Sequence, residues 1–384
     1  MIELKNLYKS YRGKSVLMNI SLTIQDNEFF VLIGSSGCGK TTLLKTLNKL
    51  NPIDKGEILI NGTPINRIKV TQLPRLMGYV VQEGGLFPHM TVEDNIALAM
   101  RVAGYPKEKI YDRITELLEL VNLEPDQYRR QYPSQLSGGQ RQRIGVARAF
   151  AADPEIILMD EPFSALDPMT RAELQDEVHR LQLRFHKTIV FVTHDMDEAV
   201  KLADRICILQ NGHVVQCDKP ENILKHPANE YINSFIGKNR LWENPSFIRA
   251  EDIMRPRPIT ISQSRTVVQA VQLMRHYNID SLLVTGDDNK FAGMVWLQDL
   301  IGIDQYSSPV SSFLSDDYLS VRVDDSLSTV LEKVADYGEK DFGILPVLDA
   351  EGAIRGFLNR SSLLSTLSRR FIDEPVERDE QEGA

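Results

Sequence analysis

The sequence predicts an α/β protein built from two unlike parts, and three observations carry this prediction. An apolar run at residues 29–33 leads into a glycine-rich loop at 34–41 and then into a helical run. Further apolar runs at 156–160 and 188–193 end next to polar residues, as strands do when ligands bind at their carboxyl ends. Beyond about residue 240 the chain repeats itself. We therefore expect a nucleotide-binding α/β domain followed by a second region of two similar α+β units.

The composition favours a multidomain protein and argues against a nucleic-acid partner. The 384 residues suggest two or three domains, and the 42% hydrophobic content can supply each with a core. The net charge of −9 lacks the basic footprint of a nucleic-acid binder. No apolar run approaches the roughly 20 residues that span a bilayer, and residues 1–5 lack the apolar core of a signal peptide. The three cysteines, Cys38, Cys207 and Cys217, show neither a disulfide framework nor metal-ligand spacing, which fits a reducing cytoplasm.

The loop at 34–41 matches the phosphate-binding pattern GxxxxGK[ST] at every fixed position. Its glycines let backbone N–H groups turn towards a phosphate chain, and the helix that follows adds a positive partial charge. We expect Lys40 to contact the β- and γ-phosphates and the Thr41 hydroxyl to bind Mg²⁺. An ordinary glycine-rich turn is the alternative, which the strand–loop–helix context disfavours. The residues expected to bind ATP here are Gly34, Ser35, Ser36, Gly37, Cys38, Gly39, Lys40, Thr41 and Thr42.

A second group of glycines precedes another helix. Ser137 is placed to cap the amphipathic helix that contains residues 141–149. Gly138 and Gly139, beside that cap, leave the end of the helix open to close approach by an anion.

Polar residues also follow the apolar runs of the predicted sheet. The run at 156–160 ends in two adjacent carboxylates, Asp160 and Glu161, and the run at 188–193 delivers His194. Because ligands gather at the carboxyl ends of strands in open α/β sheets, we expect these groups to face one crevice. The alternatives are a strand end with solvated acids and a structural histidine.

This ordered set of motifs resembles the ATP-binding subunit of an ABC transporter, over roughly residues 1–235. Gly34–Thr41 match the Walker A motif, Leu136–Gln140 the ABC signature and Ile156–Asp160 the Walker B strand. The resemblance implies five further assignments: Gln82 as the Q-loop glutamine, Glu161 as the catalytic glutamate, Asp167 as the D-loop aspartate, His194 as the switch histidine and Tyr11 as the aromatic residue that stacks on adenine.

The resemblance also implies the chemistry of ATP hydrolysis. Phosphoryl transfer depends mostly on positioning and electrostatic stabilisation. Thr41, Gln82 and Asp160 would hold Mg²⁺, directly or through water. Glu161 would polarise the attacking water as general base, and His194 would orient that water and the γ-phosphate.

One Walker A motif and one signature in the same chain imply a dimer. In the family, the signature residues complete the ATP site of the opposite subunit, and here they are Ser137, Gly138, Gly139 and Gln140. We therefore expect a head-to-tail homodimer through the ATPase domains, with two ATP molecules between the subunits. ATP binding would close this dimer and hydrolysis would release it.

The stretch after Gln82 is the expected attachment to a transporter. In the family, the region that begins at residues 83–95 receives a coupling helix from the membrane subunit. Separate permease subunits are expected, with an extracytoplasmic substrate-binding protein as an indirect partner and a peripheral location on the cytoplasmic face of the membrane. The competing class is a soluble ABC protein that acts on ribosomes or DNA; such proteins commonly join two cassettes and carry basic extensions.

The second region contains an internal repeat. Residues 253–274 correspond to 313–334 at a shift of 60, and Gly293 corresponds to Gly356 at a shift of 63. Each unit reads strand, amphipathic helix, strand, strand, helix, which resembles a tandem pair of CBS domains over about 251–366; the alternative is a second α/β domain without a ligand. The expected boundaries are 1–237 for the ATPase domain, 238–250 for a linker, 251–307 and 308–367 for the CBS domains, and 368–384 for a disordered acidic tail.

The repeat departs from the family's ribose-binding pattern, a Ser or Thr followed three residues later by Asp. Trp296 takes the hydroxyl position in the first unit while Asp299 remains, and Asn359 and Ser362 replace both residues in the second. Ordinary AMP or ATP binding is therefore not expected. Two alternatives remain for this regulatory pair, a symmetric ligand such as cyclic di-AMP and a response to ionic strength.

A single cassette with a C-terminal CBS pair resembles the energising subunits of osmoprotectant importers. The resemblance implies an ATP hydrolase coupled to the import of quaternary amines such as glycine betaine, carnitine or choline. An importer of amino acids or polyamines with the same regulatory pair is the alternative.

Overall fold

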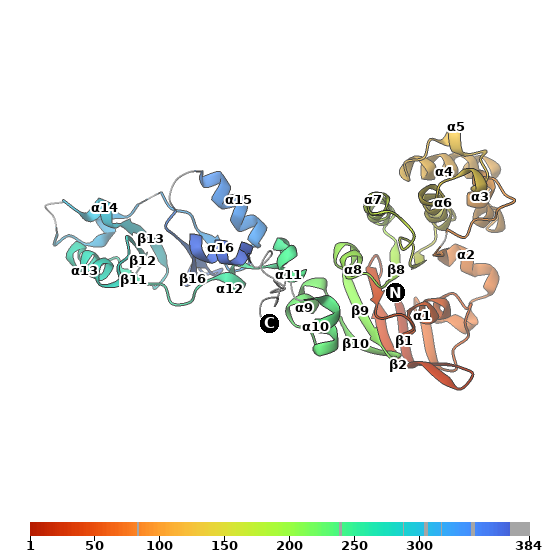
Figure 1. Cartoon of the computed structure of the whole chain (residues 1–384), viewed down its shortest axis with the longest axis horizontal. Helices are drawn as coiled ribbons and strands as arrows, with labels where there is room; N and C mark the ends of the chain where they lie inside the picture. The colour runs from red at the N-terminus through yellow and green to blue at the C-terminus, as the bar shows by residue number, and fades with distance from the viewer. Residues whose placement is uncertain are drawn as a thin grey trace, which may run out of the picture. The chain divides into compact units, whose positions relative to one another are not determined.

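The computed structural model describes residues 1–368 apart from 83, 238–239, 287, 303–305, 316 and 339–341. The chain divides into two compact units, Met1–Ile236 and Gly237–Ala384 (Figure 1). None of the helices in the described ranges combines the length and the apolar character needed to cross a membrane. The predicted acidic tail lies outside the described residues, except for Ser368.

The first unit is organised around a six-stranded sheet with the strand order β10-β9-β3-β8-β7-β6. Strand β3 (Phe29–Ile33) runs parallel to its neighbours β8 and β9. It is wholly buried, which explains its continuous apolar sequence. Only the edge strand β10 runs antiparallel, to β9. The strands are β3 (Phe29–Ile33), β6 (Met77–Val80), β7 (Ile156–Asp160), β8 (Thr188–Thr193), β9 (Arg205–Gln210) and β10 (His213–Asp218).

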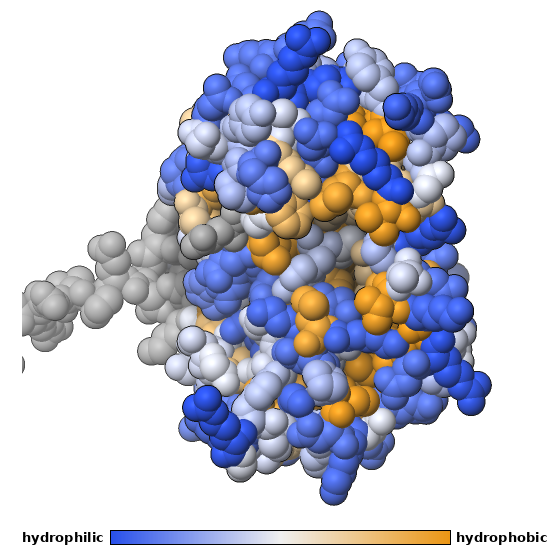
Figure 2. All heavy atoms as spheres, turned by 90° about the vertical axis from the view of Figure 1, so that its right-hand side faces the viewer, coloured by the Kyte–Doolittle hydropathy of each residue, from blue (hydrophilic) through white to orange (hydrophobic). Residues whose placement is uncertain are grey.

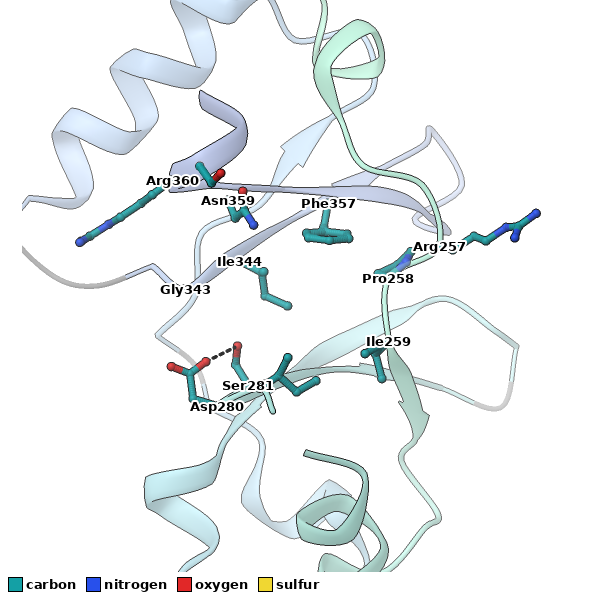
Figure 3. A pocket seen from close by; sticks show the side chains of 12 residues that line it. Arg257, Pro258, Ile259, Asp280, Ser281, Gly343, Ile344, Phe357, Asn359 and Arg360 are labelled. Carbon is teal, nitrogen blue, oxygen red and sulfur yellow. Dashed lines mark hydrogen bonds between the residues drawn. The ribbon is translucent and has the colours of Figure 1, made fainter. Parts of the chain in front are cut away.

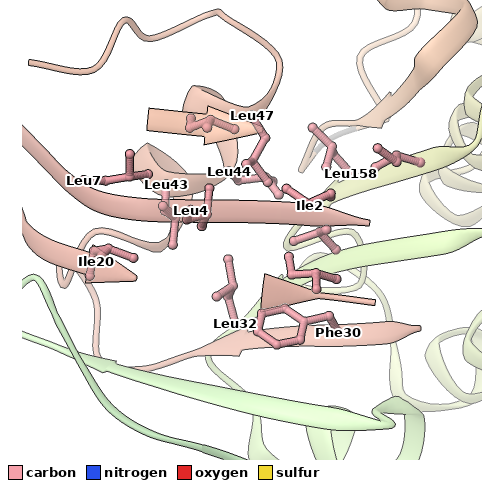
Figure 4. Packing of buried hydrophobic residues seen from close by; sticks show 14 of the residues in the cluster. Ile2, Leu4, Leu7, Ile20, Phe30, Leu32, Leu43, Leu44, Leu47 and Leu158 are labelled. Carbon is pink, nitrogen blue, oxygen red and sulfur yellow. The ribbon is translucent and has the colours of Figure 1, made fainter. Parts of the chain in front are cut away.

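A second, antiparallel sheet has the strand order β2-β1-β4-β5. Its strands are β1 (Ile2–Tyr11), β2 (Lys14–Ile24), β4 (Lys55–Ile60) and β5 (Thr63–Pro64). The helix α1 (Lys40–Leu47) joins residues of both sheets in one buried core through Leu43, Leu44 and Leu47, as Figure 4 shows. Each buried leucine contributes roughly 1.5–3 kcal/mol. This core fixes the start of α1, and with it the loop that precedes the helix.

Of the remaining helices of the first unit, α3 to α6 form a helical segment between β6 and β7, and the others come before or after it in the chain (Figure 1). Four of these helices begin at side-chain caps that the sequence supplies, Thr91 for α3, Ser137 for α6, Asp167 for α7 and Asp195 for α8. The helices are α2 (Leu73–Leu76), α3 (Val92–Val102), α4 (Lys107–Leu120), α5 (Pro125–Tyr128), α6 (Gly138–Phe150), α7 (Pro168–Phe185), α8 (Met196–Leu202), α9 (Pro220–Lys225) and α10 (Glu230–Ile236), with 3₁₀ turns η1 (Ile65–Arg67), η2 (Val70–Gln72) and η3 (Pro133–Gln135).

The second unit contains two copies of the predicted order strand, helix, strand, strand, helix. The first copy is β11 (Thr260–Ser262), α13 (Val267–Tyr277), β12 (Ser281–Thr285), β13 (Phe291–Trp296) and α14 (Leu297–Leu300). The second is β14 (Val321–Arg322), α15 (Leu327–Tyr337), β15 (Ile344–Leu348), β16 (Ile354–Asn359) and α16 (Arg360–Ser368). Even the registers correspond, because Val284 pairs with Gly293 in one sheet and Val347 with Gly356 in the other.

The two copies exchange the segments that precede their first strands. Ile253 and Met254, at the end of α12 (Ala250–Ile253), pack into the core of the second copy. The corresponding Phe313 and Leu314, at the end of the 3₁₀ turn η5 (Val310–Phe313), pack into the core of the first. The stretch predicted as a linker contains α11 (Arg240–Glu243) and η4 (Pro245–Phe247). Neither copy therefore has a complete core by itself.

Candidate functional site

The loop at residues 34–39 is held by its own lysine and by close backbone packing. The Lys40 ammonium donates to the carbonyl oxygens of Gly34 (2.8 Å) and Ser35 (3.1 Å), and the side chain is buried. Gly34 has a φ of 155°, and a Cβ there would lie 2.2 Å from the carbonyl oxygen of Leu209. At Gly39, with φ 111°, a Cβ would lie 2.9 Å from both Val16 and Leu17. Both glycines are required for this loop conformation.

A hydroxyl and a carboxylate meet beside this loop. Thr41 Oγ1, at the start of α1, donates to Asp160 Oδ1 over 2.8 Å, although 119 residues separate the two in sequence. Asp160 ends β7 and is buried, and the Tyr79 hydroxyl from β6 reaches its other oxygen at 3.4 Å. Burial and the charge of Asp160 raise the pKa of Tyr79, so Tyr79 remains a proton donor. Oxygen ligands of this kind suit Mg²⁺.

Glu161 and His194 lie against each other at the ends of β7 and β8. Glu161 Oε2 is 3.2 Å from His194 Nδ1. The Glu161 backbone N–H donates to the carbonyl oxygen of Val192 (3.0 Å), and its φ of 46° is left-handed. That conformation costs about 1–2 kcal/mol in a non-glycine residue. The carboxylate is thus held at the strand ends beside the imidazole.

Gln82 is linked to the segment that follows Glu161. Its Nε2 donates to Ser164 Oγ over 3.4 Å, and Ser164 Oγ donates to the Glu161 carbonyl oxygen over 3.1 Å. In this structure Gln82 is therefore linked through Ser164 to the backbone of Glu161. Tyr11, at the end of β1, is 42% exposed, and the Lys9 ammonium lies 5.1 Å from the centre of its ring.

The group of glycines at 137–140 forms the N-terminus of α6. Ser137 and Gln140 make a reciprocal capping box, with Gln140 N donating to Ser137 Oγ (3.2 Å) and Ser137 N to Gln140 Oε1 (2.9 Å). A Cβ on Gly139 would lie 2.7 Å from a methyl group of Thr170 in α7. Glycine at 139 therefore lets the start of α6 lie close to the Thr170 side chain of α7.

An open cleft of about 950 Å³ adjoins this helix terminus. Its walls include Ser137, Gly138 and Gly139 on one side and Asp167 and Thr170 on the other. Thr170 N donates to Asp167 Oδ1 over 3.1 Å, and the hydrogen bonds from Thr170 lower the pKa of Asp167. The cleft therefore brings the start of α6 next to the carboxylate that caps α7.

Comparison with known proteins agrees with these features. The ABC transporter family model matches residues 17–164, and the CBS domain model matches residues 250–304 and 310–369. The choline transport ATP-binding protein OpuBA of Bacillus subtilis is 44% identical over 95% of both chains. The glycine betaine/carnitine/choline transport ATP-binding protein OpuCA of the same organism is 45% identical, again over 95% of both chains.

The chain belongs to the family of osmoprotectant ABC importer ATP-binding subunits. The predicted family and α/β fold class are confirmed. Among solved structures, the first unit is similar to the dimeric ATP-binding cassette MJ0796 bound to ADP and Pi, with a TM-score of 0.53, 33% identity, and coverage of 57% of this chain and 99% of that chain. An ABC ATPase domain and two CBS domains are thus present. The roles of individual site residues stay predictions.

Two features of the ABC ATPase domain lie outside the sequence predictions. Arg148 of α6 donates to the carbonyl oxygens of Gly85 (2.7 Å) and Gly84 (3.1 Å), which binds the loop after Gln82 to the signature helix. Tyr79 contacts Asp160, as described above. An arginine near the end of an amphipathic helix is the only sequence signal for the first contact, and nothing local in the sequence indicates the second.

The CBS pair encloses a cleft of about 460 Å³, drawn in Figure 3. Ile344 and Phe357, from β15 and β16, point into it, and Ile259 lies on the opposite wall. Arg257 and Arg360 also line the cleft. With Asp280, which also lines it, the cleft offers apolar faces together with two arginines and one carboxylate.

Asn359 and Ser362, the two residues that depart from the family's ribose pattern, bond to each other. Ser362 N donates to Asn359 Oδ1 (2.8 Å), Asn359 N donates to Ser362 Oγ (3.0 Å), and Ser362 Oγ donates to the Asn359 carbonyl oxygen (2.8 Å). These bonds cap α16. They fit the expectation that ordinary ribose binding is lost at this position.

A second cleft of about 550 Å³ adjoins the corresponding residues of the first copy. It is lined by Trp296, Asp299, Asp317, Tyr337 and Asp280 among others. The indole ring of Trp296 packs close to Gly343, where a Cβ would lie 2.7 Å from it. Asp280 lines both clefts, and this one adds Asp299 and Asp317 where the first has Arg257 and Arg360.

Proposed function

We propose that this chain is the ATP-hydrolysing subunit of an importer for quaternary amines such as glycine betaine, carnitine or choline. The observation that carries the proposal is the meeting of Thr41 with Asp160 and of Glu161 with His194 beside the loop at 34–41. The similar proteins OpuBA and OpuCA, which are named for the transport of choline and of glycine betaine, carnitine and choline, support the substrate class.

Thr41 and Asp160 fit a Mg²⁺ site, since two oxygen ligands approach each other at the start of α1. We infer that Gln82 is a third ligand of the Mg²⁺ ion. When bound, Mg²⁺ neutralises the charge of the phosphates. Lys40 exchanges its bonds to the Gly34 and Ser35 carbonyl oxygens for bonds to the phosphates, in a loop that is already shaped to receive them.

Glu161 acts as the general base of the reaction. It takes a proton from water, whose oxygen attacks the γ-phosphorus while the bond to the β–γ bridging oxygen breaks, giving ADP and phosphate. His194, 3.2 Å from Glu161, orients the water and the γ-phosphate. The left-handed backbone at Glu161 aims its carboxylate at that position.

The active form is a head-to-tail homodimer. The capped N-terminus of α6, with Ser137, Gly138, Gly139 and Gln140, borders an open cleft and offers backbone N–H groups to the partner's γ-phosphate. Asp167 lies across that cleft and helps to connect the two sites. The similar MJ0796 cassette is a dimer in its complex with ADP and Pi, which supports this arrangement.

The surface between α2 and α3 receives a coupling helix of a separate permease subunit. An apolar groove of about 370 Å³ there is lined by residues that include Pro74, Phe87, Leu98 and Val102. Phe87 and Val102 are exposed, and Figure 2 shows apolar residues gathered across the middle of this side of the first unit. Arg148 lies in the groove wall and holds the Gly84 and Gly85 carbonyls.

This geometry connects the groove to the ATP site. The loop that leaves Gln82 runs through Gly85 to Phe87, so a helix seated in the groove contacts the same loop that lies beside Ser164 and Glu161. The permease places the chain on the cytoplasmic face of the membrane, and a substrate-binding protein acts on it only indirectly.

The CBS pair regulates import by binding cyclic di-AMP. Phe357 provides an aromatic face on which a base can stack, worth roughly 1–3 kcal/mol per base in single-strand binders, and Ile259 and Ile344 add apolar surface around it. Arg257 and Arg360 supply charge for the phosphates. The rival mechanism is ionic, in which salt screens attraction over a Debye length of about 8 Å at physiological strength.

The test is uptake by the complete transporter in vesicles with ATP inside. Glycine betaine, carnitine and choline should each be imported, and Glu161→Gln should abolish the import without removing bound ATP. Import of an amino acid or a polyamine in place of these compounds would establish the alternative substrate class and overturn the proposal.

A further inference from the structure

Two of the three cysteines of the chain are direct partners in the core sheet. Cys207 of β9 and Cys217 of β10 occupy the same antiparallel register position. Residues directly opposite each other point to the same face with Cβ atoms about 4.5–5.5 Å apart. A disulfide requires about 3.5–4.5 Å, so a small movement of one strand brings the two sulfur atoms to bonding distance.

The two thiols differ in environment. Cys207 is fully buried, whereas Cys217 is half-buried and accepts a hydrogen bond at 3.2 Å from Arg205 Nη2. The Cys207 thiol and the Arg205 guanidinium lower the pKa of Cys217, while the interaction with Cys217 and burial raise the pKa of Cys207. This asymmetry distinguishes an attacking thiolate, Cys217, from a resolving thiol, Cys207.

The pair lies directly behind the ATP-binding loop. Cys207 is in register with Leu32 of β3, two residues before Gly34. Two residues after Cys207, the carbonyl oxygen of Leu209 occupies the space beside Gly34 that a Cβ would fill. At the β9–β10 turn, Gly212 N donates to the Cys38 carbonyl oxygen over 3.2 Å.

We propose that Cys207 and Cys217 form a reversible disulfide that weakens ATP binding at the loop of residues 34–41. Because β9 is packed against both β3 and this loop, movement of β9 towards Cys217 changes the support of Gly34 and Cys38. Disulfides of cytosolic proteins are usually transient and redox-sensing, which fits such a pair.

The oxidant is a peroxide. The Cys217 thiolate attacks one peroxide oxygen, the O–O bond breaks, and the other oxygen leaves as water after protonation, which gives a sulfenic acid. The Cys207 thiol then attacks that sulfur, the S–S bond forms, and the sulfenic oxygen leaves as a second water. Hydrogen peroxide and two thiols are thus converted to two waters and one disulfide, and a dithiol reductant reverses the reaction.

The experiment treats the full chain with hydrogen peroxide and measures mass and ATP affinity on the same samples. The expected product is about 2 Da lighter, with the disulfide mapped to 207–217 and Cys38 still open to alkylation after denaturation. Its ATP dissociation constant should rise about three- to tenfold and recover with dithiothreitol.

Cys217→Ser is the matched control. This half-buried variant should form no intramolecular disulfide and keep its ATP affinity after peroxide. Cys207→Ser should react at Cys217 only as far as sulfenic acid, detected with a dimedone-type reagent. A disulfide that includes Cys38, no loss of mass, unchanged ATP affinity in the 207–217 disulfide form, or an equal loss of affinity in Cys217→Ser would each overturn the proposal.

Discussion

The two units use their polar residues in opposite ways. In the first, Thr41 meets Asp160 across 119 positions of sequence and Glu161 meets His194 across 33. In the second, Asn359 and Ser362 bond each other within three residues and cap a helix. The contacts in the first unit bring polar groups together from distant strands, as at a ligand site, whereas the bonds between Asn359 and Ser362 cap a helix, as those between Ser137 and Gln140 do in the first unit.

The two copies within the CBS pair differ in a second way. Arg257 lines one cleft, and its counterpart at the shift of 60, Asp317, lines the other. One fold repeated twice thus presents opposite charges at corresponding positions. We expect an anionic regulator to distinguish the two clefts.

Glu161→Gln should have the largest effect, because it removes the proposed general base and keeps the shape of the side chain. Hydrolysis should fall on the order of 10²–10⁴-fold while ATP binding persists. A steady-state phosphate assay together with nucleotide binding checks both. The control is Glu155→Gln, just before the opposite end of β7, which should hydrolyse ATP normally; normal turnover in Glu161→Gln would show that another group is the base.

Ser137→Arg should also stop hydrolysis, by placing bulk and charge at the N-terminus of α6. ATP binding to the single subunit, which we attribute to Lys40 and Tyr11, should survive. Measuring hydrolysis in the complete transporter and ATP binding by the isolated chain distinguishes a loss of hydrolysis from a loss of ATP binding. Wild-type hydrolysis in this variant would be incompatible with a signature that completes the partner's site.

Arg257→Ala tests whether the cleft lined by Arg257 is the one that binds the anionic regulator. It should weaken cyclic di-AMP binding about tenfold, the loss of one charge-assisted pair. Calorimetry on the full chain measures the affinity for cyclic di-AMP. The matched control is Asp317→Asn, which should leave this affinity unchanged. No heat from cyclic di-AMP, together with a salt activation that needs residues 251–384, would instead support ionic sensing.

Tyr79→Phe should have the smallest effect. It removes one donor to a buried carboxylate, worth roughly 0.5–1.5 kcal/mol. The Mg²⁺ concentration for half-maximal hydrolysis should shift a few-fold with little loss of maximal rate. An unchanged Mg²⁺ dependence would mean that the Tyr79 hydroxyl does not hold Asp160.

The features that could be predicted from the sequence are those that depend on the spacing of nearby residues. The GxxxxGK[ST] loop, the Ser137 cap and the apolar strands follow from patterns of a few residues, and so does the repeat after residue 240. The contacts of Tyr79 with Asp160 and of Arg148 with Gly84 and Gly85 depend on which strands and helices become neighbours. Local patterns do not determine strand order, so these contacts could not be predicted.

The reciprocal exchange in the CBS pair could not be predicted for the same reason. Ile253–Met254 and Phe313–Leu314 look alike in sequence, and a repeat by itself does not say which core each segment joins. The structure shows that each joins the other copy. An isolated single copy should therefore expose part of its core.

The proposed ATP site is formed by residues of two subunits. ATP-dependent dimerisation is the most direct test of this arrangement. Sedimentation of the full-length Glu161→Gln chain with and without Mg-ATP should show an additional ATP-dependent association, with two trapped ATP molecules per pair of ATPase domains. Adding Ser137→Arg to the same chain should abolish that association while each subunit still binds ATP. Equal ATP-dependent association with and without Ser137→Arg would contradict a site shared between subunits.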